Sequence, residues 1–227
     1  MIVGKQKPPD EIWAMIRRYK NVLILGCNTC IAVCHEGGGK EAEILASLMR
    51  IKAKQAGVDM EIRHAAIERQ CEHEFFDAAL EEIERAEAVL TTACGVGVQF
   101  MAEKFPSLPV SPGVNTTFLG ATDQPGVWEE KCQACGQCIL DQTGGICPVS
   151  RCAKRILNGP CGGSSMGKCE IDKHLDCAWQ LIIERLRLLE RLDDYEKLTP
   201  IKDWSSDRAG GPRKLISEKG SYDASVD

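Results

Sequence analysis

Residues 22–34 read VLILGCNTCIAVC, a short apolar run that leads directly into three closely spaced cysteines. A short apolar run of this kind is typical of a buried strand in a parallel sheet. The carboxyl ends of parallel strands line one edge of an open α/β sheet, where ligands bind. The stretch therefore predicts an α/β fold with thiols at that edge.

The first 125 or so residues alternate between helical and strand patterns on both sides of this stretch. The residues expected in helices are 11–19, 39–54, 74–85 and 97–105, and those expected in further strands are 60–67, 88–92 and 108–110. In the second of these helices, Ile44, Leu45, Leu48 and Ile51 share one side. The alternation predicts an open parallel sheet with helices on both faces.

The remainder of the chain has a different composition. Residues 111–128 are rich in Pro, Gly, Asn and Thr, which predicts a connecting loop. Residues 132–177 hold eight cysteines and too few apolar side chains to fold without metal. We expect three parts: an α/β domain (1–125), a cysteine-rich metal-binding module (126–177), and a helix with a polar tail (178–227).

A long C-terminal helix is expected over residues 172–192. Its apolar stripe docks onto the chain's own core or forms a subunit interface, and consists of Leu175, Trp179, Ile182, Leu186 and Leu189. After Pro200 the chain is polar and glycine-rich. This tail is expected either to be disordered or to lie over a partner.

Composition excludes several classes of function. The chain has 227 residues and a formal charge of −5 without a basic stripe, which argues against nucleic-acid binding. No apolar run reaches the ~18–20 residues of a membrane span, and MIVGKQKPPD lacks the features of a secretory signal. We therefore expect a cytoplasmic protein. In that reducing compartment 13 cysteines, an odd number, indicate metal ligation rather than disulfides.

The first group of thiols follows the predicted strands. It consists of Cys27, Cys30, Cys34, Cys71 and Cys94. Four thiolates hold a [4Fe–4S] cluster; Cys30, Cys34 and Cys94 are the strongest candidates, with Cys27 and Cys71 as alternatives for the fourth place. Inert buried cysteines, or a thioredoxin-type pair of Cys27 and Cys30, are the competing interpretations.

The second group begins with Cys132, Cys135 and Cys138, spaced as in bacterial ferredoxins, and continues to a Cys-Pro pair at Cys147. Together with Cys152, Cys161, Cys169 and Cys177 these make eight thiols, enough for two four-thiolate sites. Cys147 and Cys152 are alternatives for the fourth ligand of the first site. Zinc is the alternative metal to iron–sulfur, because paired CxxC motifs also build zinc ribbons. His174 is an alternative zinc ligand, and His35 and His73 beside cysteines are weaker ones.

No motif for substrate chemistry accompanies the cysteines. Residues 37–40 (GGGK) follow a strand as a phosphate-binding loop would, but Cys34 and Glu41 occupy positions where that motif needs Gly and Ser or Thr. No Ser/His/Asp set, paired-carboxylate motif or dinucleotide fingerprint is present. The sequence thus predicts metal chemistry without a catalytic site of its own.

Four stretches in combination resemble a known family: CNTCIAVC, VLTTACGVG, CQACGQC, and NGPCGG with GKCE. They resemble the small subunit of two-subunit methylenetetrahydrofolate reductases of acetogenic and related anaerobic bacteria, a domain also found as the C-terminal region of such reductases. The resemblance covers residues 21–192 and leaves out the tail.

The resemblance implies an electron-transfer subunit with two or more [4Fe–4S] clusters, and zinc as an alternative in the cysteine-rich part. Its partner would be a flavin-containing barrel subunit, carrying FMN or FAD, that reduces methylene- to methyl-tetrahydrofolate. Heterodisulfide-reductase-like or other subunits would supply the electrons. The folate and flavin residues of the family belong to the partner.

Overall fold

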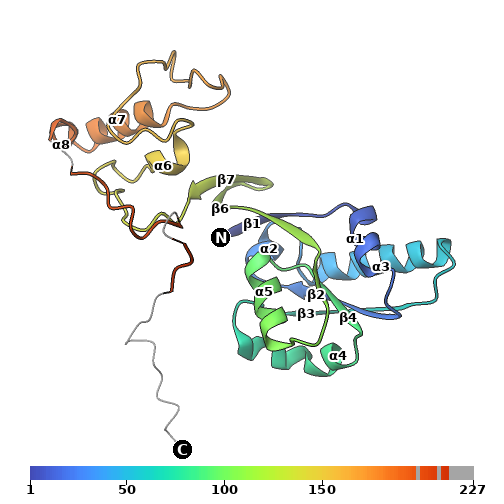
Figure 1. Ribbon diagram of the computed structural model, residues 1–227. Coiled ribbons are helices and arrows are strands. Elements are labelled where there is room, and N and C mark those ends of the chain that lie inside the picture. Colours follow the sequence, from blue (N-terminus) through green and yellow to red (C-terminus); the bar gives the residue numbers. More distant parts are fainter. Residues whose placement is uncertain (198–199, 209–210, 215–227) are drawn as a thin grey trace, which may run out of the picture. The chain divides into compact units, whose positions relative to one another are not determined.

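The computed structural model describes residues 1–197, 200–208 and 211–214 (Figure 1). The chain divides into two compact units, Met1–Glu129 and Glu130–Asp227. Each unit has its own hydrophobic core. In the described parts of the chain, no helix has the length and apolarity needed to cross a membrane.

The first unit contains a four-stranded parallel sheet in the order β3-β2-β4-β5. The strands are β2 (Asn21–Cys27), β3 (Glu61–Ile67), β4 (Ala88–Thr91) and β5 (Val110–Pro112). The apolar residues 22–25 of β2 are fully buried in the centre of this sheet. The α/β class and the parallel sheet predicted from VLILG are confirmed.

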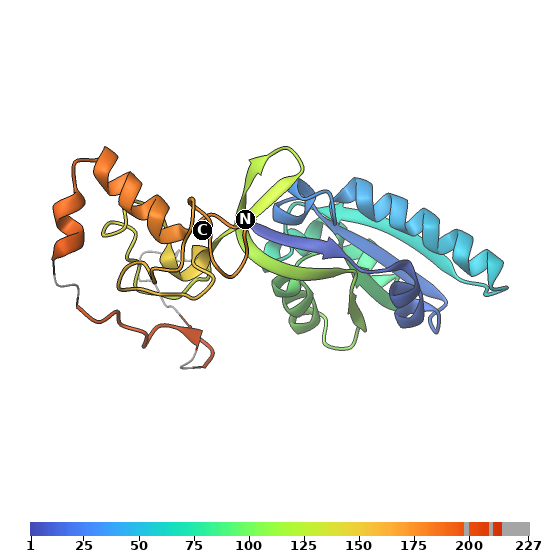
Figure 2. The same cartoon turned by 90° about the horizontal axis from the view of Figure 1, so that it is seen from above.

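Helices cover both faces of the sheet (Figure 2). On one face lie α1 (Pro9–Ile16) and α3 (Gly39–Gln55), which runs alongside β2 and β3. On the other face lie η1 (His73–Ala79), α4 (Leu80–Glu84) and α5 (Gly95–Lys104). The short α2 (Cys30–Val33) follows β2 directly and carries the CNTCIAVC cysteines.

Helix α3 does not pack on the sheet through the side that carries most of its large apolar residues. Its buried residues are Ala42, Leu45, Ala46, Met49 and Ala53, whereas Ile44, Leu48 and Ile51 are exposed. Three alanines on the buried side let the helix backbone approach the strands closely, so small size rather than apolar bulk selects the packed face.

A second, three-stranded antiparallel sheet has the order β1-β6-β7. Its strands are β1 (Ile2–Gln6), β6 (Val114–Gln124) and β7 (Val127–Cys132). The prediction of a connecting loop over residues 111–128 is therefore wrong. Pro125 and Gly126 form a tight turn between β6 and β7 with Gly126 at φ 84°, so the Pro and Gly mark one hairpin turn instead of a long loop.

The second unit contains short helices and loops. These helices are α6 (Pro148–Arg151), α7 (Ala178–Leu188) and α8 (Leu192–Glu196). Its core is small, with Trp179, Ile182 and Leu186 buried on α7. The stripe predicted from the sequence thus docks at its centre, while its two ends, Leu175 and Leu189, are exposed.

The long C-terminal helix predicted over residues 172–192 is wrong, because the backbone at both ends is engaged in other bonds. Before α7, the amide of Cys177 donates to the carbonyl of Gly167 (2.8 Å), and Asp172 caps a turn by accepting from the amide of His174. After α7, Glu190 adopts the left-handed conformation (φ 55°), which ends the helix.

The described part of the tail lies on the second unit of the same chain. Lys202, Asp203 and Arg213 donate hydrogen bonds to the loop around Cys135. These residues are ordered against their own unit, contact of the tail with a partner stays a prediction, and residues 215–227 lie outside the described part of the chain.

The GGGK stretch has a packing role. A Cβ added at Gly37 would lie 2.0 Å from the carbonyl oxygen of Thr92, and the Gly37 carbonyl itself accepts bonds from the Cys27 amide and the Thr92 hydroxyl. Gly37 therefore lets the backbone after α2 lie against the ends of β2 and β4. This close approach explains the glycine without any phosphate.

We expect Gly37→Ala to destabilise the protein by about 2–3 kcal/mol, because overpacking against backbone cannot be relieved by a side-chain rotation. The measurement is the urea-unfolding midpoint. Gly95→Ala is the matched control, since the nearest atom to an added Cβ lies 3.5 Å away and it begins a helix. Equal midpoints for the two variants would contradict this explanation of Gly37.

Candidate metal centres

Three cysteines lie at or after the carboxyl ends of β2, β3 and β4. Cys27 ends β2 and is buried, Cys71 lies in the exposed loop after β3, and Cys94 is the N-cap of α5 after β4. Burial raises the pKa of the Cys71 thiol, and the nearby charges of Cys27 and Cys94 raise it further. Cys71 therefore lies within electrostatic range of Cys27 and Cys94, while ligation of one cluster by these thiols stays a prediction.

Cys30 and Cys34 lie on and just after α2. Burial is the main cause that raises the pKa of the Cys34 thiol, with smaller contributions from Glu36 and Cys30. Its sulfur lies 3.4 Å from the carbonyl oxygen of Cys30 and 3.7 Å from that of Ile2. Cys30 is half-buried, so of the two it is the more accessible to a ligand at the edge.

A buried polar network, which the sequence pattern does not reveal, holds the edge together. Gln70 is 1% exposed, and its amide donates to the carbonyls of Leu25 and Gly26, both at 3.1 Å. Its own carbonyl accepts from the Thr91 hydroxyl, which in turn accepts from the Ala93 amide. Gln70 thus ties the end of β2 to the end of β4 and fixes the segments that carry Cys27, Cys71 and Cys94.

The loop around Cys132, Cys135 and Cys138 has backbone suited to an anionic centre. Ala134 (φ 51°) and Gly136 (φ 89°) are left-handed, and alternation with left-handed residues turns successive amides toward one side, as in the nests that bind Fe–S centres. The Ala134 amide already donates to the sulfur of Cys132 (3.3 Å). The loop thus fits the ferredoxin-like interpretation of its spacing.

Four of the remaining cysteines line one cavity of about 20 Å³ in the second unit. They are Cys152, Cys161, Cys169 and Cys177. Cys147 does not line it. Cys152 therefore lies with the later cysteines at this cavity and Cys147 does not, while the fourth ligand of the first site stays a prediction.

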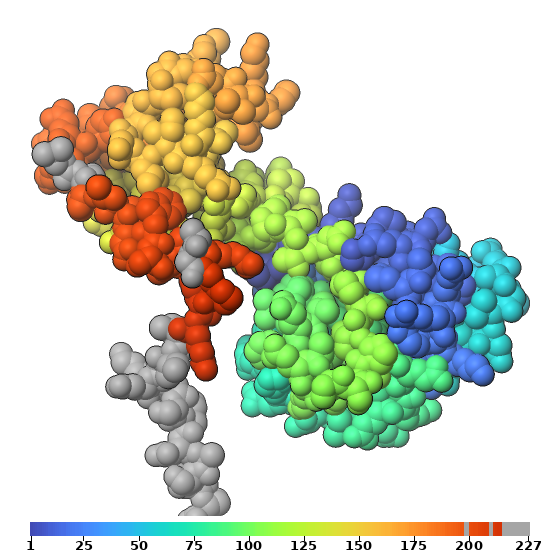
Figure 3. All heavy atoms as spheres, in the orientation of Figure 1, coloured from blue at the N-terminus to red at the C-terminus, as the bar shows by residue number. Residues whose placement is uncertain are grey.

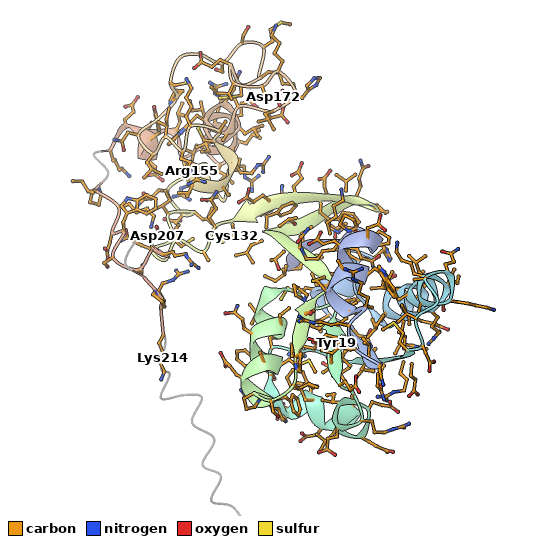
Figure 4. All side chains as sticks on the ribbon, turned by 45° about the vertical axis from the view of Figure 1, so that its right-hand side comes forward. Tyr19, Cys132, Arg155, Asp172, Asp207 and Lys214 are labelled. Carbon is orange, nitrogen blue, oxygen red and sulfur yellow. The ribbon has the colours of Figure 1, made fainter. Side chains whose placement is uncertain are left out.

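Local backbone bonds hold two of these four cysteines in place. The Cys169 amide donates to the carbonyl of Leu175 (2.9 Å), and the Cys177 amide donates to that of Gly167 (2.8 Å). The indole of Trp179 donates to the carbonyl of Ile156 (2.7 Å) and so anchors the stretch between Cys152 and Cys161 to α7. Figure 4 shows this part of the unit around the labelled Arg155 and Asp172.

Cys161 is the cysteine of this cavity best prepared as a thiolate. The backbone amide of Gly163, which donates to its sulfur at 3.4 Å, lowers the pKa of Cys161, and the Lys154 ammonium adds to this. Lys154 also forms an ion pair with Glu170, another residue that lines the cavity. This environment favours the deprotonated thiol that a metal needs.

In the described residues, no group of three or more His, Cys, Asp or Glu side chains is already arranged to hold a metal ion. All 13 cysteines are free of disulfides. The structure therefore shows which cysteines lie in the same region of the fold, and each complete ligand set stays a prediction.

The histidines lie apart from the four-cysteine cavity. His174 is exposed and does not line it. His73 is stacked on Phe100 with 4.7 Å between the ring centroids, and His64 approaches Arg50. The residues that sequence reasoning misses are instead Gln70, the Lys154–Glu170 pair, and Lys202 beside the Cys135 loop. Gln70, Lys154 and Glu170 lie within two residues of a cysteine, which is their only signal in the sequence. Lys202 has no such signal.

Residues 111–205 match a known sequence family. That family is described as the methylene-tetrahydrofolate reductase C terminal. The matched part holds β6, β7 and all eight cysteines of the second group, and it extends beyond residue 192 into the tail. The resemblance is confirmed for this reductase C-terminal domain. Neither a curated protein nor a solved structure matches the chain.

We expect Gln70→Ala to lower the free energy of unfolding by about 2 kcal/mol, because the buried Thr91 hydroxyl loses its acceptor and the Leu25 and Gly26 carbonyls each lose one donor. Urea unfolding measures the change. Gln99→Ala is the control, since Gln99 is exposed and bonds only within its own helix, to Gly95. A Gln70 variant as stable as the Gln99 variant would show that the network does not hold the edge.

Proposed function

We propose that this chain is the iron–sulfur electron-transfer subunit of a methylenetetrahydrofolate reductase. Two observations support it: residues 111–205 match the reductase C-terminal family, and four cysteines of the second unit line one cavity. Iron–sulfur clusters carry single electrons, and a flavin accepts electrons singly and delivers a hydride equivalent. The chain's part is then to hold clusters, and the substrate binds on its partner.

At the sheet edge, the ligands we propose for one [4Fe–4S] cluster are Cys27, Cys71 and Cys94 with Cys30 as the fourth. Cys94 lies at the N-terminus of α5, where the helix dipole stabilises negative charge. Cys34 suits the site least, because its sulfur is buried against backbone carbonyls.

A second [4Fe–4S] cluster would use Cys132, Cys135 and Cys138 of the nest-like loop, with Cys147 as the fourth ligand. Cys147 precedes Pro148 at the start of α6, the Cys-Pro combination that completes ferredoxin sites. The Ala134 amide supplies one of the hydrogen bonds to sulfur that such sites use.

We assign a single zinc ion, the alternative metal for paired cysteine motifs, to the cavity lined by Cys152, Cys161, Cys169 and Cys177. Four thiolates around one Zn²⁺ form a closed structural site. The apolar core of the second unit is small, so such a site would contribute much of its stability.

The partner of this chain would be a flavin-containing subunit, with FMN or FAD, that reduces methylene- to methyl-tetrahydrofolate. A heterodisulfide-reductase-like or other subunit would supply electrons to the clusters. A cytoplasmic location follows from this role. The competing function is a zinc-stabilised assembly subunit without redox activity. The four-cysteine cavity, considered by itself, favours this second function.

Anaerobic purification followed by metal analysis tests the proposed function. We expect about eight iron, about eight acid-labile sulfide and about one zinc per chain, with an EPR signal after reduction by dithionite. The reduced protein should also pass electrons to the flavin of the partner subunit. A colourless protein that contains zinc alone, without an EPR signal, would establish the assembly subunit instead.

A pair of cysteine variants tests which thiol belongs to which site. We expect Cys152→Ser to lose the zinc and to unfold the second unit, because that unit has little apolar core. Tryptophan fluorescence measures the unfolding. Cys147→Ser should keep the zinc and lose about four iron atoms. The assignment fails if the two variants exchange these results.

Buried Cys27 also argues against a thioredoxin-type role for Cys27 and Cys30. Its side chain is only 6% exposed, and its sulfur lies 3.6 Å from the Thr29 hydroxyl. A redox-active thiol needs access to its substrate. The edge of the sheet therefore supports ligation of a cluster better than exchange with disulfides.

A further inference from the structure

Lys202 is a buried lysine in the otherwise exposed tail. Only 7% of its surface is exposed, and its ammonium donates to the carbonyl of Gln137 at 2.6 Å and reaches that of Cys135 at 3.5 Å. It also lies 4.6 Å from the centre of the Trp204 ring. A positive charge is thus fixed against the backbone of the CxxCxxC loop.

The tail around Lys202 is packed onto this loop by further contacts. The Asp203 amide donates to the side-chain carbonyl of Gln137 (2.6 Å), and Arg213 donates to the carbonyl of Ala134 (2.6 Å). Gly136 approaches Ser206 so closely that an added Cβ would lie 1.8 Å from the Ser206 hydroxyl. Residues 201–208, which we name the strap, therefore cover one side of the loop.

The figures show the same arrangement. In Figure 4 the labelled Asp207 and Cys132 belong to segments that run side by side, and Figure 3 shows the strap, in orange-red, packed against the rest of its unit. The reductase C-terminal family match ends at residue 205, so Lys202 and Trp204 lie within the matched domain.

The contacts of Lys202 fix the orientation of the loop amides. In a trans peptide the carbonyl and the amide hydrogen of one unit point in opposite directions. Because the carbonyls of Cys135 and Gln137 point to the ammonium, the amides of Gly136 and Cys138 point to the other side of the loop. That is where amide donors are needed if the loop wraps a centre held by its own sulfurs.

Lys202 also lacks a close anionic partner in the described residues. None of their ion pairs includes it. The charge of Lys202 has a small effect on Asp203. The pKa of Asp203 is lowered chiefly by the hydrogen bond from the Ser205 amide, and Lys202 is the smallest cause. A buried cation without an ion pair is unfavourable. A dianionic four-thiolate centre beside it would compensate that charge.

We propose that Lys202 is a positioning residue that raises the reduction potential of the cluster held by the Cys132–Cys135–Cys138 loop. The inference rests on the proposed function, since it requires a cluster at this loop. Reduction adds one electron, supplied by an external reductant such as dithionite, and makes the centre one unit more negative. A fixed positive charge stabilises that reduced form relative to the oxidised one.

The test is EPR-monitored redox titration of the full chain carrying Lys202→Gln. The glutamine amide keeps a hydrogen-bond donor for the carbonyls and removes the charge. We expect the one-electron equilibrium constant for reduction to fall about tenfold, a shift of about 59 mV to more negative potential. Loss of the signal in Cys135→Ala identifies which cluster is being observed.

Two variants separate charge from shape. Lys202→Arg should hold the potential near that of the unmodified protein, because it keeps both charge and donors. Lys214→Gln removes the same charge from an exposed position of the tail and should leave the potential unchanged. The shift in Lys202→Gln should persist at high salt, since buried charges are screened little.

The outcomes are distinguishable. An unchanged potential in Lys202→Gln overturns the role of Lys202, even when the iron content supports the proposed function. If Lys202→Gln fails to hold the cluster while Lys202→Arg holds it, the need for charge is upheld. Equal loss in both variants overturns it in favour of shape. No Cys135-dependent cluster in the unmodified protein overturns the proposed function as well.

Discussion

The placement of cysteines by the backbone is the constraint on which this structure depends. Burial raises the pKa of the Cys34 and Cys71 thiols, and neutral thiols hold one another only weakly, so backbone geometry has to position them. The two units solve this differently. The first uses the edge of a rigid parallel sheet, where Gln70 and Gly37 lock the strand ends together. The second uses loops with left-handed residues, amide donors to sulfur and lysines beside the loops.

The sequence predicts the first unit well because its signals are local. The run VLILG specifies a buried parallel strand, and the topology then brings Cys27, Cys71 and Cys94 to one edge. The antiparallel sheet escapes prediction because β1 and β6 are separated by more than 100 residues, and β6 carries polar side chains on exposed positions. A pattern of Thr and Asn between Pro and Gly predicts a loop. Only the pairing with the distant strand β1 shows that this segment is a strand.

The second unit is harder to read from the sequence, for a different reason. The apolar stripe on α7 is correctly recognised, but the length of the helix depends on the backbone bonds of Cys177 and the left-handed Glu190, which periodicity does not show. The choice between Cys147 and Cys152 depends on which thiol faces α7 and the hairpin of residues 165–177. Lys202 is more remote still, 64 residues beyond Cys138, in a polar tail whose composition predicts disorder.

The two units therefore differ in what a metal does for them. The first has two apolar clusters, one on each face of its sheet, and is folded by burial whether or not a cluster is bound at its edge. There the metal adds chemistry to an existing fold. In the described residues, the second has a small apolar core around Trp179, Ile182 and Leu186, and four of its cysteines line one cavity. Under the proposed function, binding energy at the thiolates would add to this limited hydrophobic burial. If one metal centre both stabilised its domain and exchanged electrons, the surrounding loops could not adjust to its change of charge without loss of stability. Under the proposed function, separate sites would resolve this conflict, because zinc in the four-cysteine cavity would hold the fold while the charge of the CxxCxxC loop changes beside Lys202.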